Sequence, residues 1–434
     1  MLNCKEGKDH RVNMADPGRL PCSRFSHGRP VTVFRRGALP LVLLQSVACA
    51  GDQSSTGEHP STTWITEAEH QFGDAPERGV FFSRPYVRSD PTRNRVFVLD
   101  AVNSQVSAWT DRGSLLFAVG RRGEGPGEFG FPQDMFIDAD GSFAVLDNSG
   151  VRFTYYAANG QLIETESGMN NAVSYQGLGL AVTFPLDGTY LGVVRANADL
   201  EAGIDGLPPF VRQPLLSVRR SGTGQWEIPR PVLWLDVSNR IRVLKHPDGN
   251  PSYGSQPFGD ADQFRLERGA AVVMRLKEAP GAVELVEVSG EGDTVWHRRL
   301  SFEPRRLTSG MVEQEIEEAV DILAPDAPQG MSRPVLRDAL SESLYRPQYL
   351  PAAEGPPVLT ASGEVWLKTY EVSDTLRTHY VVRRGESDEV PRRLLLPEWF
   401  RVRDATATHV WGVWWDAMDR PHVVGRRLVP LNEG

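Results

Sequence analysis

The sequence predicts an all-β fold, a six-bladed β-propeller with a short two-helix insertion and a disordered N-terminal export segment. The main observation is an internal repeat, because residues 84–116 align without a gap with residues 131–163 at an offset of 47 positions. Each copy contains four strand patterns separated by turn residues, and four strands in about 45 residues make one blade of a propeller. Two further observations are an apolar N-terminal segment that ends in a cysteine and a single helical stretch after residue 308.

The two copies agree at the positions that build a blade. A proline leads into the first strand, a tight turn follows, and the second strand ends in the letters VLD. The matched pairs are Pro85 with Pro132, Asn94 with Gly141, Asp100 with Asp147, Trp109 with Tyr156, and Gly113 with Gly160. A third copy begins in phase at Asp187-Gly188. Asp-Gly between two strand patterns predicts a hairpin, because the tightest hairpin turns require positive φ.

The later blades are more divergent copies of the same plan. We expect the third blade over about 187–234, with a proline-rich insertion, and the fourth over 263–300. The fifth blade is expected over 358–396 and a shortened sixth blade over 400–428. A seventh blade is the alternative if the stretch 200–262 contains one.

The two ends of the chain are expected to meet in the last blade. A propeller closes when the last blade takes a strand from the other terminus, because an open sheet edge pairs with other chains. Residues 62–68 precede the first repeat and are the candidate closing strand. In the last blade Trp411 and Trp415 share one face of a strand and Trp414 takes the other. We interpret the three as core and inter-blade packing, with an exposed stacking surface for a sugar or a peptide as the alternative.

One stretch, 309–325, breaks the β pattern. Its apolar residues recur at helical spacing, Ser309 is expected to cap its start and Pro325 to end it. A second helix is expected from Ser332. Together they form an insertion over about 309–345, which we interpret as packed on the rim of the propeller. A lid over the central channel or a partner-docking surface is the alternative.

Residues 1–50 are typical of an export signal. Two arginines precede the apolar run 38–48, which is too short to span a bilayer as a helix and leads directly to Cys49. The run resembles a bacterial lipobox, although Ser46 stands where that pattern has Leu, and the resemblance implies lipidation of Cys49. Cleavage by an ordinary signal peptidase and no export at all are the alternatives. The residues before the signal indicate an over-extended start, with Met14 as one candidate for the true one.

Composition limits the partners of the rest of the chain. Residues 51–63 are polar and rich in Ser and Thr, which predicts a flexible tether before a propeller at 64–434. After position 48 there are 39 basic and 53 acidic residues, and such a surface repels phosphate backbones. We therefore expect no nucleic-acid partner, and membrane contact through the lipid anchor. All three cysteines precede residue 50, which excludes a disulfide framework or a cysteine-based metal site in the body of the chain.

The stretch from Val119 to Leu162 resembles the NHL-type repeat, whose pattern combines spaced glycines, a Phe, a Pro, an Asp-Gly turn, an Arg and a final Gly. The matching positions are Gly125, Gly127, Phe129, Pro132, Asp140, Gly141, Asp147, Arg152, Tyr156 and Gly160. The first copy has Gln105 in place of the Arg. The whole chain is similar to bacterial six-bladed propeller lipoproteins of undefined function. Other members of the fold are scaffolds, RNA-binding modules, lactonases and lyases, so the fold alone does not choose a function.

The glycine-rich stretch 120–131 contains GPGEFG, the spacing of a dinucleotide-binding loop. Such a loop must open a helix whose N-terminus holds the phosphates, but here Pro132 leads into a strand. Glu124 and Glu128 would also repel a phosphate. We therefore interpret the stretch as the connection between two blades, in which Phe129 fills the gap between them.

No sequence motif carries catalytic or metal-binding chemistry. The letters DADG at 138–141 lack the later ligands of a calcium loop and are expected to form a turn. The seven histidines after position 49 lie far apart in the sequence, and neither H-E-x-x-H nor G-x-S-x-G occurs. We therefore assign no catalytic, cofactor or metal-binding residue. A propeller site can still be assembled from single residues of several blades.

These observations favour an exported binding or scaffold module in the cell envelope, at its periplasmic or outer-membrane face. It would hold an unknown envelope protein or a small ligand at its channel or loops. The alternative is a hydrolase or lyase of the lactonase kind, with or without a metal. The two differ in the polar side chains that line the channel, and in whether three or more carboxylates or imidazoles converge there.

Overall fold

The computed structural model describes residues 63–72, 82–147, 152–167, 174–175, 178–194, 211–246, 251–327, 331–385 and 389–431. The predicted export segment with Cys49 and the tether at 51–62 lie outside these residues. The described chain is mostly β-strand and contains two α-helices. None of its helices is long and apolar enough to cross a membrane.

The first three blades are antiparallel sheets that follow one another along the chain. Blade 1 consists of β2 (Pro85–Asp90), β3 (Arg95–Asp100), β4 (Gln105–Thr110) and β5 (Leu115–Val119). Blade 2 consists of β6 (Pro132–Ile137), β7 (Phe143–Asp147), β8 (Arg152–Tyr156) and β9 (Leu162–Ser167). Blade 3 consists of β11 (Leu178–Val182), β12 (Thr189–Val194), β13 (Arg212–Arg219) and β14 (Arg230–Asp236), with β10 (Ser174–Tyr175) added beside β11.

The other three blades complete the ring. Blade 4 consists of β17 (Gln263–Glu267), β18 (Ala270–Arg275), β19 (Ala282–Ser289) and β20 (Thr294–Ser301). Blade 5 consists of β21 (Val358–Leu359), β22 (Glu364–Ser373), β23 (Leu376–Arg383) and β24 (Arg392–Pro397). Blade 6 consists of β25 (Arg401–Ala405), β26 (His409–Trp415), β27 (Pro421–Pro430) and β1 (Thr63–Phe72).

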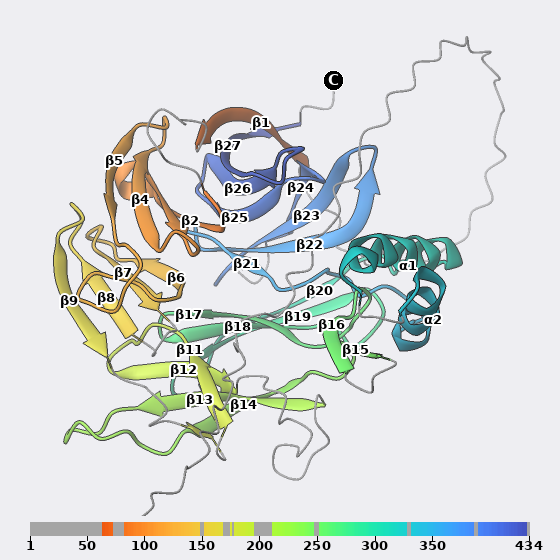
Figure 1. Cartoon of the computed structure of the whole chain (residues 1–434), viewed down its shortest axis with the longest axis horizontal. Coiled ribbons are helices and arrows are strands. Elements are labelled where there is room, and N and C mark those ends of the chain that lie inside the picture. The colour runs from red at the N-terminus through yellow and green to blue at the C-terminus, as the bar shows by residue number, and fades with distance from the viewer. Residues whose placement is uncertain are drawn as a thin grey trace, which may run out of the picture.

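The first strand of each blade lies near the centre of the ring, and the last strand lies outside (Figure 1). Strand β2 contacts both β25 and β6, so blades 6, 1 and 2 are consecutive around the ring. The six-bladed propeller is confirmed. In the described part of 200–262, the only strands outside blade 3 are the hairpin of β15 (Ile241–Lys245) and β16 (Pro251–Ser255). The alternative of a seventh blade there is wrong, because a two-stranded hairpin cannot replace a four-stranded sheet.

The turns of the repeat have the backbone conformation that their residues favour. Asn94 adopts φ of 50° and the matched Gly141 adopts 83°, so both residues occupy the left-handed region. In the third copy Asp187 and Gly188 both have positive φ, and the flanking residues Leu186 and Thr189 exchange two backbone hydrogen bonds. The hairpin predicted from Asp-Gly is therefore present, with the two positive φ values of the tightest hairpin type.

A buried aspartate at the end of the second strand holds the connection that enters each of the first two blades. Asp147 accepts hydrogen bonds from the backbone N–H groups of Gly130 and Phe131, at 2.7 and 2.8 Å. Asp100 accepts the equivalent bonds from Ser83 and Arg84, at 2.7 and 3.1 Å. The repeat of 47 residues is thus preserved in the hydrogen bonds as well as in the letters.

The glycine-rich connection between blades 1 and 2 is additionally held by Arg152. Its guanidinium pairs with the fully buried Asp147 at 2.8 Å. It also donates to the carbonyls of Glu124 and Glu128, at 2.6 Å each. The loop that resembled a phosphate cradle therefore turns its carbonyl groups toward an internal cation and leads into a strand.

The closing strand is confirmed, and β1 is longer than predicted. It pairs antiparallel with β27 from Trp64 opposite Pro430 to Phe72 opposite Val423. The ring of Phe72 stacks between Trp109 of blade 1 and Trp411 of blade 6, with both centroid distances 5.5 Å. The N-terminal strand thus completes the last blade and also fills the joint between the last and the first.

The three tryptophans of the last blade lie as predicted. Trp411 is buried and Trp415 is partly buried in the cluster that contains Phe72, whereas Trp414 packs in the cluster on the opposite face. Their interpretation as core and inter-blade packing is confirmed.

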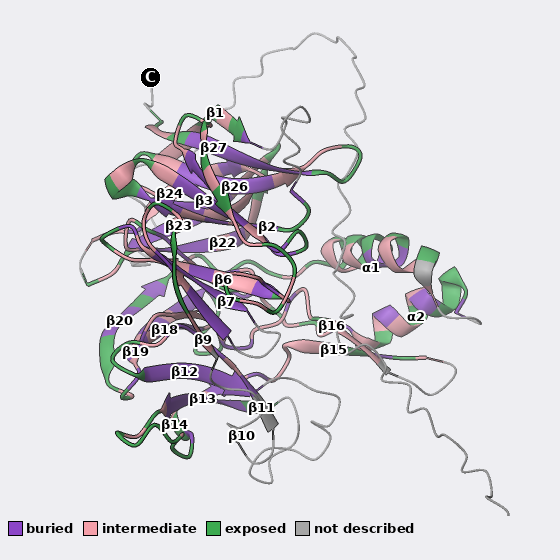
Figure 2. Cartoon of the chain, turned by 60° about the vertical axis from the view of Figure 1, so that its left-hand side comes forward, coloured by how far each residue is buried: buried purple, intermediate pink, exposed green. Residues whose placement is uncertain are grey.

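The helical insertion is confirmed as α1 (Ser309–Leu323) and α2 (Arg333–Ser343). Figure 2 shows both helices beyond the blades, next to the β15–β16 hairpin. They share an apolar core with that hairpin and with the propeller. This core includes Leu244, Phe258, Ile316, Leu336 and Leu340, with Tyr370 of β22 packed against it. The insertion is therefore packed against the ring, as predicted.

The start of α1 differs from expectation by one residue. The side chain of Thr308, not Ser309, accepts the capping hydrogen bond from the N–H of Met311, because Thr308 has the extended backbone of a cap and Ser309 is already helical. As expected, the α-helix ends just before Pro325, at Leu323. The proline lies in a short 3₁₀ turn, Ala324–Asp326, where its missing N–H leaves no bond unmade.

We expect Asp147→Ala to be strongly destabilising, because it leaves Arg152 buried without a charge partner and frees two backbone N–H groups. Breaking a buried pair costs about 3–5 kcal/mol. Urea unfolding of Asp147→Ala should show a much lower midpoint at an unchanged slope. The control is Arg333→Ala, which removes an exposed pair with Asp321 and should cost about 0–1 kcal/mol. Equal losses in the two variants would contradict the role of Asp147.

Burial raises the pKa of Glu315 on α1 to about 7, although the nearby charge of Arg242 opposes the rise. The folded chain therefore keeps this proton to a higher pH than the unfolded chain, and stability falls as the pH rises from about 4.5 to about 7. Glu315→Gln removes this loss. It should raise the melting temperature at pH 8 and leave it nearly unchanged at pH 4.5, whereas exposed Glu342→Gln should change neither. A pH-independent effect of Glu315→Gln would contradict the assignment.

Candidate functional site

The first strands of four blades bring charged residues to the centre of the ring. On β2 the half-buried residues Tyr86 and Arg88 alternate with buried Val87, as the two-residue period of a strand requires. A β-bulge in β6 precedes Asp134, which is half-buried. Strand β17 contributes Arg265 and β25 contributes Arg403. These four strands, β2, β6, β17 and β25, are each the innermost strand of their blade.

Asp134 shows that these side chains meet across the axis. Its carboxylate pairs with Arg88 of blade 1 at 2.9 Å and with Arg265 of blade 4 at 3.2 Å. Blade 3 stands between blade 2 and blade 4 in the ring. The Asp134–Arg265 pair therefore spans the interior of the ring and does not simply join neighbouring blades.

Arg403 is the least compensated charge of this arginine cluster, which we define as Arg88, Arg265 and Arg403. Its guanidinium lies over the ring of Tyr86, with Cζ 5.6 Å from the centroid. Its Nε is buried and has no hydrogen-bond partner, and its side chain makes no ion pair within the described part of the chain. Asp134 therefore pairs with two of the three guanidinium groups, those of Arg88 and Arg265.

Burial is the largest influence on the pKa of each arginine in the cluster. Burial lowers the pKa of Arg403 to about 10, and the charges of Arg265 and Arg88 add to that effect. Burial also lowers the pKa of Arg265, despite its pairing with Asp134. For Arg88 the effect of burial is outweighed by Asp134 and other nearby carboxylates, so its pKa is raised. The proton on Arg403 is thus the one that its surroundings stabilise least.

The next carboxylate along β17 pairs with an arginine of another blade. Glu267 accepts a bidentate contact from Arg384, at 2.7 and 3.2 Å, and Arg384 also lies 3.6 Å from Glu287. Beyond it, Arg268 pairs with Asp138 of blade 2. The acidic side chains at this end of β17 are therefore engaged by arginines other than those of the cluster.

Asp404 holds the strand that presents Arg403. Its buried carboxylate accepts backbone hydrogen bonds from Ser89 of blade 1 at 2.6 Å, and from Ala361 of blade 5 and Ala405, at 2.7 Å each. Burial raises the pKa of Asp404, and the charge of Arg88 opposes that rise. Asp404 thus ties three consecutive blades together directly beside the cluster.

Planar guanidinium groups bind carboxylate and phosphate through paired N–H donors. Arg403 has a buried Nε without a hydrogen-bond partner in the part of the chain that the structure describes, which leaves a donor available to a carboxylate or phosphate. Among the described residues, the one group of three His, Cys, Asp or Glu side chains close enough to share a metal lies elsewhere, on β1 and β26. The arginine cluster therefore presents guanidinium N–H donors on the inner strands of three blades.

The residues of the NHL-like pattern lie between and within blades 1 and 2. Phe129 is fully buried between the two blades, packed with Phe97 on one side and Met135 on the other. A side chain at Gly120 would collide with the Phe129 ring, at 2.3 Å from an added Cβ. The other positions form loop turns, the hairpin turn and the internal ion pair, and these are Gly125, Gly127, Pro132, Asp140, Gly141, Asp147, Arg152, Tyr156 and Gly160.

The letters DADG form the expected turn. The N–H of Gly141 donates to the carbonyl of Asp138, and the carboxylate of Asp140 accepts from Ser142. Asp138 itself pairs with Arg268.

Sequence analysis did not find the arginine cluster. The available signal was the alternation of charged with apolar residues in first strands, as in Arg88, Arg265 and Arg403. Nothing in the spacing showed that these residues meet. His70 and His409 lie far apart in the chain but close together in space, because β1 closes the last blade.

The comparisons with known proteins agree with the fold. Residues 90–174 match the model of the DUF5128 family, which is described as a 6-bladed beta-propeller. No curated protein matches the sequence. Many solved structures share the architecture at low identity.

Three of these solved structures illustrate the range. A candidate exported protein of Bacteroides fragilis is 11% identical, with 85% of this chain and 99% of that chain covered and a TM-score of 0.41. A member of the duf4221 family from Bacteroides vulgatus is 10% identical, with coverage of 85% and 98% and a TM-score of 0.43. A gluconolactonase from Xanthomonas campestris is 11% identical, with coverage of 80% and 87% and a TM-score of 0.34. At these values the likeness carries no argument about function.

Proposed function

We propose that the chain is an exported, lipid-anchored β-propeller that acts as a binding or scaffold module in the cell envelope and holds an anionic group of its ligand at the axis. The observation that carries this proposal is Arg403. Its guanidinium lies in a half-buried place beside two other guanidinium groups, and no carboxylate is paired with it in the described structure.

A buried ion without a partner is costly, and folded proteins normally pair it. Asp404 and the inner strands hold Arg403 in this place at the expense of stability. A ligand carboxylate or phosphate would supply the missing partner, and the desolvated surroundings would strengthen the contact.

The ligand class follows from the donors. A carboxylate or phosphate group can accept the fork of Arg403, and Tyr86 offers a ring face and a hydroxyl beside it. The surface of the chain is acidic overall, with more Asp and Glu than Lys and Arg. Attraction of an anion is therefore local to the axis, which favours a defined ligand over polyanions that bind a whole surface.

Export and anchoring rest on the sequence of residues 1–50 and on Cys49. The polar stretch 51–63 would then act as the tether, and a flexible chain of this length reaches roughly 20 Å. The described structure begins with β1, the strand that closes the ring. An anchor at Cys49 would thus hold the propeller at its closing strand.

Binding at the axis is tested with small anions. Citrate, phosphate and gluconate should each be titrated at constant ionic strength, with chloride as the reference, while the melting temperature and the heat of binding are measured. At least one anion should raise the melting temperature, and Arg403→Gln should weaken its binding at least about tenfold, as expected for a charge-assisted contact. Affinity should fall as the pH rises through about 10, because Arg403 then loses its charge.

The matched control is Arg299→Gln, which removes an exposed arginine paired with Glu278. It should leave anion binding unchanged. Equal loss in both variants, or no response to any anion, would exclude an anion site at the axis. Turnover in a panel of lactones and esters would favour the hydrolase alternative instead.

The anchor is tested separately. Cys49→Ser should move the chain from the membrane fraction to the soluble fraction after cell lysis, because the lipidated sulfur is lost. Membrane association that persists unchanged in Cys49→Ser would show that the lipobox interpretation is wrong.

A further inference from the structure

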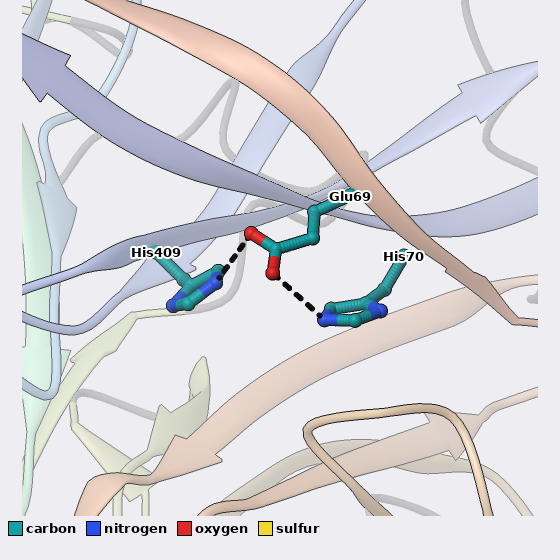
Figure 3. Close-up of side chains that lie close together, drawn as sticks. All are labelled: Glu69, His70 and His409. Carbon is teal, nitrogen blue, oxygen red and sulfur yellow. Dashed lines mark hydrogen bonds and ion pairs between the residues drawn. The ribbon is translucent and has the colours of Figure 1, made fainter.

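A second group of polar side chains lies on the outer part of blade 6, where the closing strand meets the rest of the ring. Glu69 and His70 belong to β1, and His409 is the first residue of β26. Figure 3 shows the Glu69 carboxylate between the two imidazoles. One ligand atom from each of the three residues lies within 4.8 Å of the other two.

We propose that Glu69, His70 and His409 bind a divalent transition-metal ion, and that zinc is the ion they suit best. The proposal does not depend on the function of the axis. Two imidazoles and one carboxylate are a donor set that zinc accepts, whereas calcium and magnesium prefer sites made of oxygen alone.

A β-bulge makes the arrangement possible. Neighbouring residues of a regular strand point to opposite faces, so Glu69 and His70 would normally be separated by the sheet. The register between β1 and β27 shifts between Ala68 and His70, which leaves Glu69 as the extra residue of a bulge. Both side chains can then face His409 across β27, as Figure 3 shows.

The distances suit a tetrahedral ion. Ligands that lie 2.0–2.1 Å from a tetrahedral zinc are roughly 3.3 Å apart. The Nε2 atom of His409 lies 3.1 Å from one Glu69 oxygen, and the Nε2 atom of His70 lies 3.6 Å from the other. Small side-chain rotations would therefore bring three ligands to one ion and leave the fourth position for water.

Neighbouring groups already orient the two rings. The Nδ1 atom of His409 is 2.9 Å from the Thr408 hydroxyl, which leaves Nε2 for the ion. The His70 ring stacks on Trp411 at 6.4 Å and 12°. Gly425 stands between them in the sheet, and its missing side chain leaves room for the Trp411 ring. A site with oriented ligands loses less entropy when the ion binds.

One charge opposes the ion. The Nε of Arg427 lies 3.7 Å from the Glu69 carboxylate, and its guanidinium also pairs with Glu67. A bound zinc ion would have to share the Glu69 carboxylate with Arg427. We therefore expect Arg427→Gln to bind zinc more tightly than the natural chain.

The consequence of binding is a link between the two ends of the fold. Residues 69 and 70 are separated from residue 409 by nearly the whole propeller in the sequence, so the unfolded chain does not hold the three ligands together. An ion that binds the folded form alone lowers the unfolding constant about 100-fold at a free concentration of 100 times its dissociation constant. Zinc would thus fasten the closing strand.

The test uses the full chain without a histidine tag, stripped of metal with a chelator. Calorimetric titration with zinc should give one strong site per chain, and zinc should raise the melting temperature while magnesium does not. His409→Gln and His70→Gln should each remove the strong site. Thr408→Val should weaken it about 10-fold, as expected for loss of a group that orients a ligand.

His297→Gln is the matched control, because His297 is exposed and pairs with Glu284 at 2.8 Å without a second imidazole. It should leave zinc binding unchanged. Far-UV circular dichroism without metal checks that each variant is folded. If His70→Gln does not fold, His409→Gln is the variant that decides the test. Absence of a strong zinc site in the natural chain, or equal loss in His297→Gln, would overturn the proposal.

Discussion

The fold depends on the closure of the ring by its first strand. Blade 6 supplies only three strands of its own, β25 to β27, and β1 adds the fourth. The same strand places Phe72 between Trp109 and Trp411, at the joint between the last blade and the first. Without this pairing β27 would be an open edge, and the inner strands would lose the geometry that brings Arg403 to Arg88 and Arg265. The arrangement of the arginine cluster at the axis therefore depends on closure of the ring by β1.

Within the ring, buried aspartates join the apolar clusters in holding the blades together. Asp147 and Asp100 each hold the backbone that enters their own blade, at positions 47 residues apart. Asp404 instead joins three blades at the centre. Each carboxylate satisfies backbone N–H groups that the turns between strands leave unpaired, which is why these residues can be buried at acceptable cost.

Local signals explain what the sequence could predict. Prolines, tight turns and strand patterns lie within one blade, so the repeat, the closing strand, both helices and most of the later blades could be predicted. The third blade begins earlier than expected, because its first strand β11 starts at Leu178 and not near residue 187. The cap at Thr308 was missed by one residue because Ser309 is an equally good capping residue.

The arginine cluster and the His70–His409 pair were not visible, because their members come from different blades and no spacing relates them. The bulge at Glu69 follows from pairing with β27, which a single strand pattern does not reveal. The propeller could thus be predicted from the sequence. The two candidate sites could not, because their residues come together only when the ring closes.

The most direct measurement of the central claim is the position of a bound anion in a crystal of the chain. Crystals soaked in selenate or bromide should show an anomalous peak at the axis, within hydrogen-bonding distance of Arg403, and the peak should vanish in Arg403→Gln. Peaks found only on the outer surface, or an axial peak that persists in Arg403→Gln, would contradict the account.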